Sequence, residues 1–228
     1  MKRLIAGLLA LSVAAFTGTA AKADAFEDIL KKGVVRIATP LDVPPMGSQN
    51  AQREAEGFDI DLAGMVAKAL GVKLEMQQVT GANRIPFLLT NKVDIVISVM
   101  GLTPERAKQI MFTSSYADTN LAVFGPKSAK VTSAAEIGSL KVAAAKGTTQ
   151  ELALSAMNPK AQIMRTEDDA TAAAAYLSGQ AELFATNSLL IPDMLKNNPS
   201  KEFELKFAIR RNPAHMPRAR RNRAGNCV

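Results

Sequence analysis

The chain has 228 residues, of which 47% are hydrophobic and 5% aromatic, enough to fill the core of one ordinary domain or of two small lobes. Its net charge of +7 comes from the two ends, because three basic residues lie in positions 1–23, four lie in 217–228, and neither end contains Asp or Glu. The 28 basic residues less these seven leave 21, which matches the 21 acidic residues. A neutral body argues against a nucleic-acid-binding face.

The single Cys and the single His, Cys227 and His215, lie near the C-terminus. One Cys cannot form a disulfide within the chain. Nor does one Cys with one His favour a Cys/His metal site or a His-dependent catalytic triad. The sequence therefore predicts no metal, no cofactor and no catalytic residue.

The N-terminus has the pattern of a cleavable signal peptide. A positive start, Met1-Lys2-Arg3, precedes the apolar run 4–16 and the A-x-A sequence Ala21-Lys22-Ala23. The run is short for a membrane span, and no Cys follows it that could carry a lipid. We predict that residues 1–23 are removed and that the mature protein is soluble and periplasmic, not a lipoprotein; the alternative is an uncleaved anchor.

The first half of the body alternates between helix and strand patterns. The predicted elements are helix 26–32, strand 34–39, helix 57–70, strand 72–79, helix 81–91, strand 93–99, a short helix from Thr103 and strand 120–124. The proline-rich loop 40–47 fits either a ligand-contacting loop or a stiff connector. Phe58 and Met65 belong to the apolar face predicted for helix 57–70, and Asp59 is expected to favour the helix dipole rather than to bind a metal.

The second half repeats this alternation after a polar linker, 127–132. Its predicted elements are strands 141–145, 161–165, 181–185 and 203–209 and helices 148–157, 167–178 and 187–197. We therefore predict an α/β protein with lobe 1 at 24–125 and lobe 2 at 126–209, and a ligand in the cleft between them. Residues 217–228 have no apolar period and four Arg, a pattern typical of disorder.

At residues 93–106 a predicted buried strand is followed by a polar turn and then by the start of a helix. Ser98, Gly101 and Thr103 are small or hydroxylic, and Thr103-Pro104-Glu105 reads as a helix N-terminus. Ligands of open α/β sheets bind where strands end in this way. Arg106, in the first turn, adds a guanidinium suited to a carboxylate.

Two further junctions have the same form. Lys146-Gly147-Thr148-Thr149-Gln150 and Ala185-Thr186-Asn187-Ser188 each lie between a predicted strand and a predicted helix. Hydroxyl and backbone N–H groups at a helix start suit an anion. Each junction alone fits simple helix capping, but three such junctions on one rim favour a binding site.

Six segments resemble one known family, the periplasmic solute-binding proteins of the polar amino-acid type (solute-binding family 3), which are receptor subunits of ABC importers. The segments are Gly57-Phe58-Asp59-Ile60-Asp61-Leu62, Asn83-Arg84-Ile85-Pro86, Val93-Asp94 to Ser98, Leu102-Thr103-Pro104-Glu105-Arg106, Phe112-Thr113 and Gly147-Thr148-Thr149-Gln150-Glu151. The resemblance implies a two-lobed periplasmic-binding-protein fold of type II, built from βα sheet lobes, that closes by a hinge. It also implies a monomer that serves an inner-membrane ABC permease.

The resemblance implies a role for each matching position. Arg106 would hold the ligand α-carboxylate together with Thr148 and Thr149, and Ser98 and Gly101 would offer further contacts. The family usually has an Asp for the ligand ammonium where this chain has Asn187. Asp42 is the candidate substitute, unless the ligand has no ammonium group.

Arg84 resembles the arginine that acidic-amino-acid receptors of the family use for a side-chain carboxylate. With Arg106 it implies a polar or acidic amino acid, or a related carboxylate; a surface salt bridge is the alternative for Arg84. Some relatives are cyclohexadienyl dehydratases, which need a general acid, and Asp42 and Glu151 are the candidates here. Family members continue here with a strand and helices that return to the first lobe, whereas residues 210–228 of this chain become basic. We therefore expect a truncated or frameshifted version of that returning segment, followed by a disordered basic tail.

Overall fold

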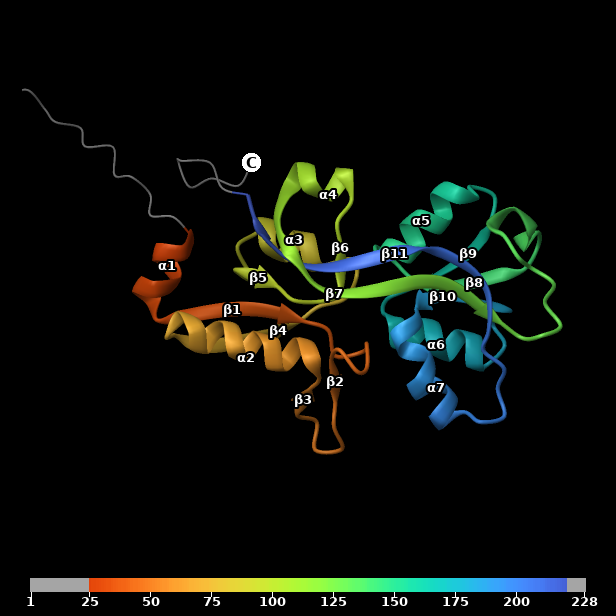
Figure 1. The fold of residues 1–228 in the computed structure, drawn as a ribbon, viewed down its shortest axis with the longest axis horizontal. Coiled ribbons are helices and arrows are strands. Elements are labelled where there is room, and N and C mark those ends of the chain that lie inside the picture. The colour runs from red at the N-terminus through yellow and green to blue at the C-terminus, as the bar shows by residue number, and fades with distance from the viewer. Residues whose placement is uncertain (1–24, 221–228) are drawn as a thin grey trace, which may run out of the picture.

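The computed structural model describes residues 25–220, so the predicted signal peptide and residues 221–228 of the predicted tail lie outside the described residues. Figure 1 shows two lobes side by side, joined by the long strands β7 (Ile110–Gly125) and β11 (Glu204–Ala219). Within the described part, no helix is long and apolar enough to cross a membrane.

The first lobe places helices on both faces of a short sheet. Its helices are α1 (Ala25–Lys32), α2 (Phe58–Leu70), α3 (Arg84–Leu89) and α4 (Pro104–Gln109). Its strands are β1 (Val34–Thr39), β4 (Lys73–Gln78), β5 (Ile95–Val96) and β6 (Met100–Gly101), beside the hairpin of β2 (Ser48–Gln49) and β3 (Ala55–Glu56). Strand β1 pairs in parallel with β4 and β5.

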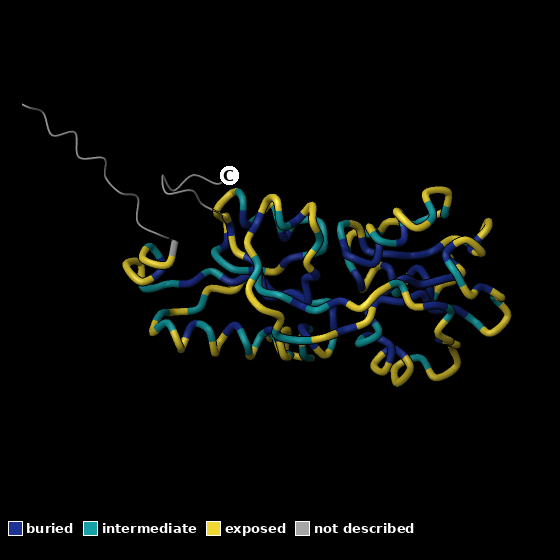
Figure 2. The backbone as a smooth tube through the Cα atoms, turned by 45° about the horizontal axis from the view of Figure 1, so that its top comes forward, coloured by how far each residue is buried: buried dark blue, intermediate teal, exposed yellow. Residues whose placement is uncertain are grey.

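The second lobe repeats the pattern. Its strands are β8 (Lys141–Ala145), β9 (Gln162–Thr166) and β10 (Leu183–Asn187). Its helices are α5 (Thr149–Met157), α6 (Asp169–Leu177), α7 (Ile191–Asn197) and the 3-10 turns η1 (Ala134–Ile137) and η2 (Ser188–Leu190). Strand β8 pairs in parallel with β9 and β10, and Figure 2 shows that burial concentrates on the strands.

One sheet runs through both lobes in the order β4-β1-β5-β11-β7-β10-β8-β9, with β6 beside β11. Strands β7 and β11 are antiparallel partners along most of their length. The predictions of a short strand at 120–124 and another at 203–209 were therefore too short. The prediction of disorder from Pro217 is wrong for Pro217–Ala219, which pair with β7, because a neighbouring strand supplies hydrogen bonds that the local sequence does not show.

The predicted strand 93–99 is only partly a strand. Its apolar side chains are buried as expected, but only Ile95–Val96 pair with β1, and Met100–Gly101 pair separately with β11. Val99 lies between the two pairs with a φ of 44°, a left-handed conformation that is strained for a β-branched residue. This turn interrupts the ladder, and the backbone of Val99 bonds instead to side chains of the long strands: its N–H donates to the Tyr116 hydroxyl and its carbonyl accepts from Asn212 Nδ2.

Helix α2 buries only part of the predicted apolar face: Leu62, Val66 and Leu70 pack against the core beside the buried Ala63 and Ala67. Phe58 and Met65 are 50% and 66% exposed, whereas Asp59 is fully buried. Asp59 Oδ1 accepts a hydrogen bond from the hydroxyl of Tyr116, which itself accepts one from the N–H of Val99. Asp59 lies in the first turn of α2 as predicted, but it is buried there and supports the turn at Val99 through Tyr116.

Burial raises the pKa of Asp59 from 3.8 to about 6, against the opposing effects of the Tyr116 hydrogen bond and the charge of Arg84. A raised folded-state pKa stabilises the fold below about pH 4, and this contribution is lost as the pH rises through 6. We expect Asp59→Asn to flatten the pH dependence of unfolding free energy by about 2–3 kcal/mol between pH 4 and 8.

Urea unfolding at several pH values would measure this slope. Asp61→Asn is the matched control, because Asp61 is exposed in the first turn of the same helix. Equal slopes for Asp59→Asn and the wild type would contradict the prediction.

Candidate functional site

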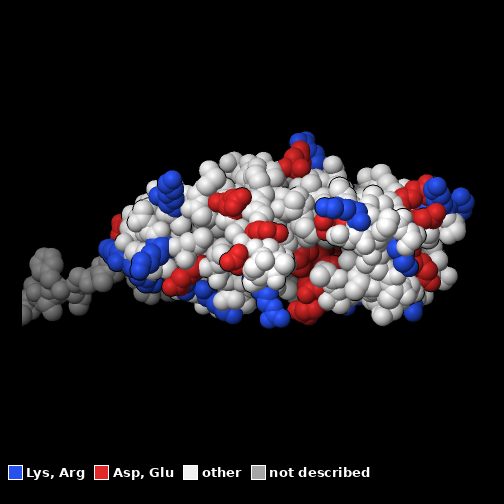
Figure 3. Space-filling model, turned by 90° about the horizontal axis from the view of Figure 1, so that it is seen from below, with Lys and Arg blue, Asp and Glu red and all other residues white. Residues whose placement is uncertain are grey.

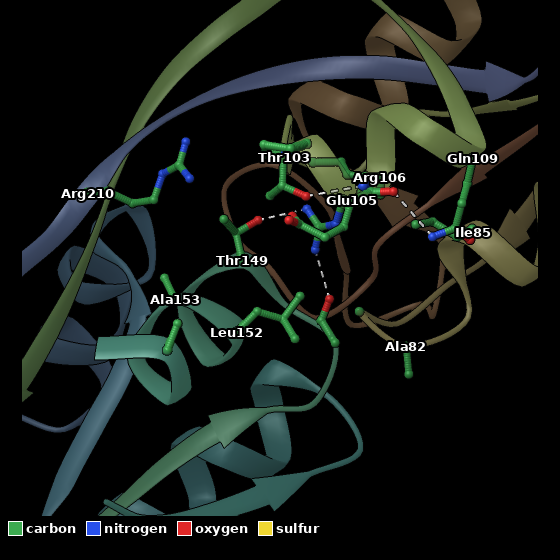
Figure 4. A pocket seen from close by; sticks show the side chains of 15 residues that line it. Ala82, Ile85, Thr103, Glu105, Arg106, Gln109, Thr149, Leu152, Ala153 and Arg210 are labelled. Atoms are coloured by element: carbon green, nitrogen blue, oxygen red, sulfur yellow. Dashed lines mark hydrogen bonds between the residues drawn. The ribbon is translucent and has the colours of Figure 1, made fainter. Parts of the chain in front are cut away.

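Arg106 lies where helix α4 begins. Thr103 caps the helix, its hydroxyl accepting a hydrogen bond from the N–H of Arg106 at 3.3 Å, and Pro104 occupies the first turn as the sequence predicts. The Arg106 side chain is 4% exposed. Its Nη1 donates to the Gly101 carbonyl at 2.7 Å. Its Nη1 also donates to Thr149 Oγ1 at 2.9 Å, and its Nη2 donates to the Gly147 carbonyl at 2.9 Å (Figure 4).

The Arg106 guanidinium therefore links the two lobes through neutral acceptors. Burial lowers its pKa to about 10, and the positive charges of Arg84 and Arg210 act in the same direction. No salt bridge joins Arg106 to a carboxylate among residues 25–220. A buried cation without an anionic partner is a favourable site for a ligand carboxylate.

The second junction presents the N-terminus of α5 to Arg106. Thr148 caps the helix by accepting from the N–H of Glu151, while Glu151 Oε2 accepts from the N–H of Gly147, an arrangement close to a capping box. Gly147 has a φ of +71°, and a Cβ there would lie 2.9 Å from Ala82 Cα. The two lobes thus meet backbone to backbone at this turn.

The third junction ends at Asn187, where β10 passes into η2. Asn187 Oδ1 accepts from the N–H of Leu189 at 3.1 Å, and its Nδ2 donates to Thr119 Oγ1 at 2.9 Å. The same Thr119 hydroxyl accepts from Nδ2 of Asn212 at 3.2 Å and donates to the Asn212 carbonyl at 2.9 Å. Asn187 is thereby tied to both long strands, since Thr119 belongs to β7 and Asn212 to β11.

Two cavities adjoin these junctions, and Thr149 borders both. The larger one, about 580 Å³, lies between α3 and α4 of one lobe and α5 of the other, with apolar walls that include Ile85 and Leu152 (Figure 4). The smaller one, about 20 Å³, offers the space of about one water molecule. Its lining residues are Val43, Arg84, Val99, Leu121, Thr148, Thr149, Gln150, Asp169, Asn187 and Asn212.

The structure brings most of the predicted site residues together. Thr103 and Arg106 border the large cavity, and Thr149 borders both cavities. The small cavity also contains the predicted residues Arg84, Thr148 and Asn187.

Three predicted residues border neither of these cavities. Ser98 is fully buried, and its Oγ has no hydrogen-bond partner. Gly101 packs against Asn212, whose Oδ1 would lie 2.0 Å from a Cβ at that position. Asp42 faces a third cavity of about 280 Å³, and its Oδ2 accepts from the N–H of Asp169 at 2.8 Å, across the lobes.

Asp169 and Asn212 were not predicted as site residues, although both border the small cavity. Asp169 begins α6, so its sequence context indicates only helix capping. Gln150 ends the predicted junction 146–150, and it lines the small cavity. Asn212 belongs to the long strand β11, and no local signal distinguishes it.

Acidic side chains gather at the hollow between the lobes on the face that carries α2 and α6 (Figure 3). Burial raises the pKa of Asp169 to about 7, and the nearby charge of Asp42 adds to this, while Arg84 opposes it. The pKa of Asp42 is raised as well, first by burial, although the hydrogen bond from Asp169 counteracts it. In the described part of the chain, no cluster of His, Cys, Asp and Glu could hold a metal ion.

Comparison with known proteins identifies this arrangement. The model of the family described as bacterial extracellular solute-binding proteins, family 3, matches residues 35–211. The glutamine-binding protein of Geobacillus stearothermophilus is 31% identical over 189 residues, which cover 81% of this chain and 72% of that protein. The crystal structure of the cysteine-binding protein from Campylobacter jejuni superposes with a TM-score of 0.79 at 28% identity, covering 86% of this chain and 80% of that one.

An enzyme also appears among the relatives. The cyclohexadienyl dehydratase of Pseudomonas aeruginosa is 26% identical over 215 residues, which cover 89% of this chain and 80% of the enzyme. The two-lobed type II fold is therefore common to receptors and to an enzyme, so the fold alone does not define the activity.

Proposed function

Because the chain belongs to the bacterial extracellular solute-binding proteins of family 3, we propose that it is an amino-acid receptor of an ABC importer. It binds a free amino acid between its lobes in the periplasm and presents the closed form to an inner-membrane permease as a monomer. The signal-peptide pattern of residues 1–23 supports export.

The observation that carries this proposal is the buried Arg106 guanidinium, which contacts both lobes and has only neutral acceptors. A ligand α-carboxylate can accept from this guanidinium and from the N–H groups at the start of α5. The same contacts would connect the lobes, so ligand binding and closure support each other.

A cavity beside Arg106 supports this binding mode. The 580 Å³ cavity is within the size range of ligand pockets, and Arg106 forms part of its wall next to Thr149. The 20 Å³ cavity on the other side of Thr149 is too small for an amino acid. A ligand side chain enters it only when the lobes separate or the lining side chains reorient, as expected for a hinge-closing receptor.

Isothermal titration calorimetry of the purified protein with the twenty common amino acids tests the proposal. We expect saturable binding of one amino acid or a small group of them, with a Kd in the micromolar range or below. A folded protein that binds none of them would overturn the proposal.

The dehydratase alternative requires an available general acid, and the two candidates from the sequence are engaged. Glu151 accepts hydrogen bonds from the N–H of Gly147 and from Ser155, and it pairs with Arg165 at 2.8 Å. Asp42 accepts from Asp169. Incubation with prephenate or arogenate is the matching assay, and turnover would favour the enzyme.

A further inference from the structure

Arg84 is a buried cation that forms no salt bridge with any residue of the described range 25–220. It lies at the start of α3 and is 6% exposed, and its Nε has no hydrogen-bond partner. No hydrogen bond or salt bridge ties its guanidinium to another residue of the described chain. Such a group is costly in the folded state unless a ligand or water satisfies it.

Arg84 lines the small cavity together with polar side chains of the second lobe, Thr148, Gln150 and Asp169 among them. Burial raises the pKa of three carboxyl groups, namely Asp42, Asp59 and Asp169, and the positive charge of Arg84 opposes each of these increases. The charge of Arg84 also lowers the pKa of Arg106. One unpaired guanidinium is therefore within electrostatic reach of both the carboxylate site and the acids of the second lobe.

Asp169 lines the small cavity together with Arg84. It is the first residue of α6 in the second lobe and is 5% exposed, and its Oδ1 accepts from Gln150 Nε2 at 3.3 Å. The other polar lining groups, including Gln150, Asn187 and Asn212, are neutral amides and hydroxyls. The cavity thus presents one cation and one carboxylate, contributed by different lobes.

This pairing selects a neutral group that both accepts and donates hydrogen bonds. We propose that the small cavity reads a side-chain carboxamide, whose oxygen accepts from Arg84 and whose NH₂ donates to Asp169. The inference rests on the proposed function, since Arg106 would hold the α-carboxylate of the same amino acid.

Charged side chains fit the cavity less well. A ligand carboxylate would meet Asp169, whose pKa the nearby charge of Asp42 already raises. A ligand cation would meet the unpaired Arg84. A neutral carboxamide places no like charge against Arg84 or Asp169. Its two hydrogen bonds would also connect α3 of the first lobe to α6 of the second.

Calorimetry at pH 8 with glutamine, asparagine, glutamate, aspartate, arginine and histidine tests the inference. We expect the wild type to bind a carboxamide amino acid at least 10-fold more tightly than the acid of the same length. Asp169→Asn removes the negative charge and should shift this preference at least 10-fold toward the acid. Arg84→Gln should weaken carboxamide binding at least 10-fold.

Asp168→Asn is the matched control. Asp168 caps the same helix through a hydrogen bond from the N–H of Thr171, and Asn caps equally well. This variant should leave the preference within about 2-fold of the wild type. The shift toward the acid in Asp169→Asn is a gain of binding, which loss of folding cannot imitate.

The possible results separate the two proposals. Tightest binding of an acidic or basic amino acid, still dependent on Arg106, would overturn the carboxamide inference and leave the receptor function in place. Carboxamide binding unaffected by Arg84→Gln would overturn the assignment of this cavity. A folded wild type that binds no amino acid would overturn the receptor function itself, and the carboxamide inference with it.

Discussion

Replacing Arg106 with alanine is expected to weaken amino-acid binding by at least about 100-fold. The guanidinium donates to Gly101, Gly147 and Thr149, and in the proposed complex it also holds the ligand carboxylate. Truncating one partner of a buried, hydrogen-bonded charge pair costs about 2–5 kcal/mol, and about 2.8 kcal/mol corresponds to 100-fold. Both ligand contact and lobe contact are lost in this variant.

Calorimetry with the best ligand of the wild type measures this loss of affinity, and two further variants serve as comparisons. Arg106→Lys keeps the charge without the planar fork and should lose part of the affinity. Arg210→Ala removes an exposed guanidinium that borders the same large cavity, and should change the Kd by less than about 3-fold. A Kd for Arg106→Ala within 3-fold of the wild type would refute the carboxylate assignment.

Gly147→Ala is expected to weaken ligand binding by at least about 10-fold, because it destabilises the closed arrangement of the two lobes. The φ of +71° makes any side chain unfavourable by about 1–2 kcal/mol. In addition, the new Cβ would lie 2.9 Å from Ala82 Cα and 3.0 Å from the Gly81 carbonyl, both in the opposite lobe. The lobes could not then approach as closely as they do, and contacts of Arg106 with the turn would lengthen.

Gly179 provides the control for this variant. Its φ is +79°, yet nothing lies within 4 Å of the position that a Cβ would occupy. Gly179→Ala should therefore lose similar stability in urea unfolding while keeping the wild-type Kd. If both variants bind like the wild type, the close approach of the two turns is not required for ligand binding.

The local sequence determined the parts of this protein that depend on near neighbours. The helix start at Thr103-Pro104, the caps at Thr148 and Gly71, and the alternation of strands and helices follow from propensities and capping that act within a few residues. Junction motifs also predicted that Arg106 and Thr149 belong to one site, and their hydrogen bond joins the lobes.

The remaining features were decided by tertiary contacts. Strand β11 continues to Ala219 because β7 lies beside it, although its basic sequence favours disorder. Asp59 is buried because its carboxylate accepts a hydrogen bond from Tyr116, which in turn accepts one from the strained turn at Val99. Its place in the first turn of the helix by itself suggests an exposed acid.

The composition of the site depends on the same cause. Arg84 and Asp169 are 85 positions apart, and only the approach of the two lobes places them on one cavity. The sequence by itself thus predicted the fold class and singled out Arg106, because both predictions rest on local patterns, and the proposed role of Arg106 in carboxylate binding builds on that pattern. The balance of charge that a ligand side chain meets was decided by the tertiary structure, since it arises from residues of different lobes that no local pattern connects.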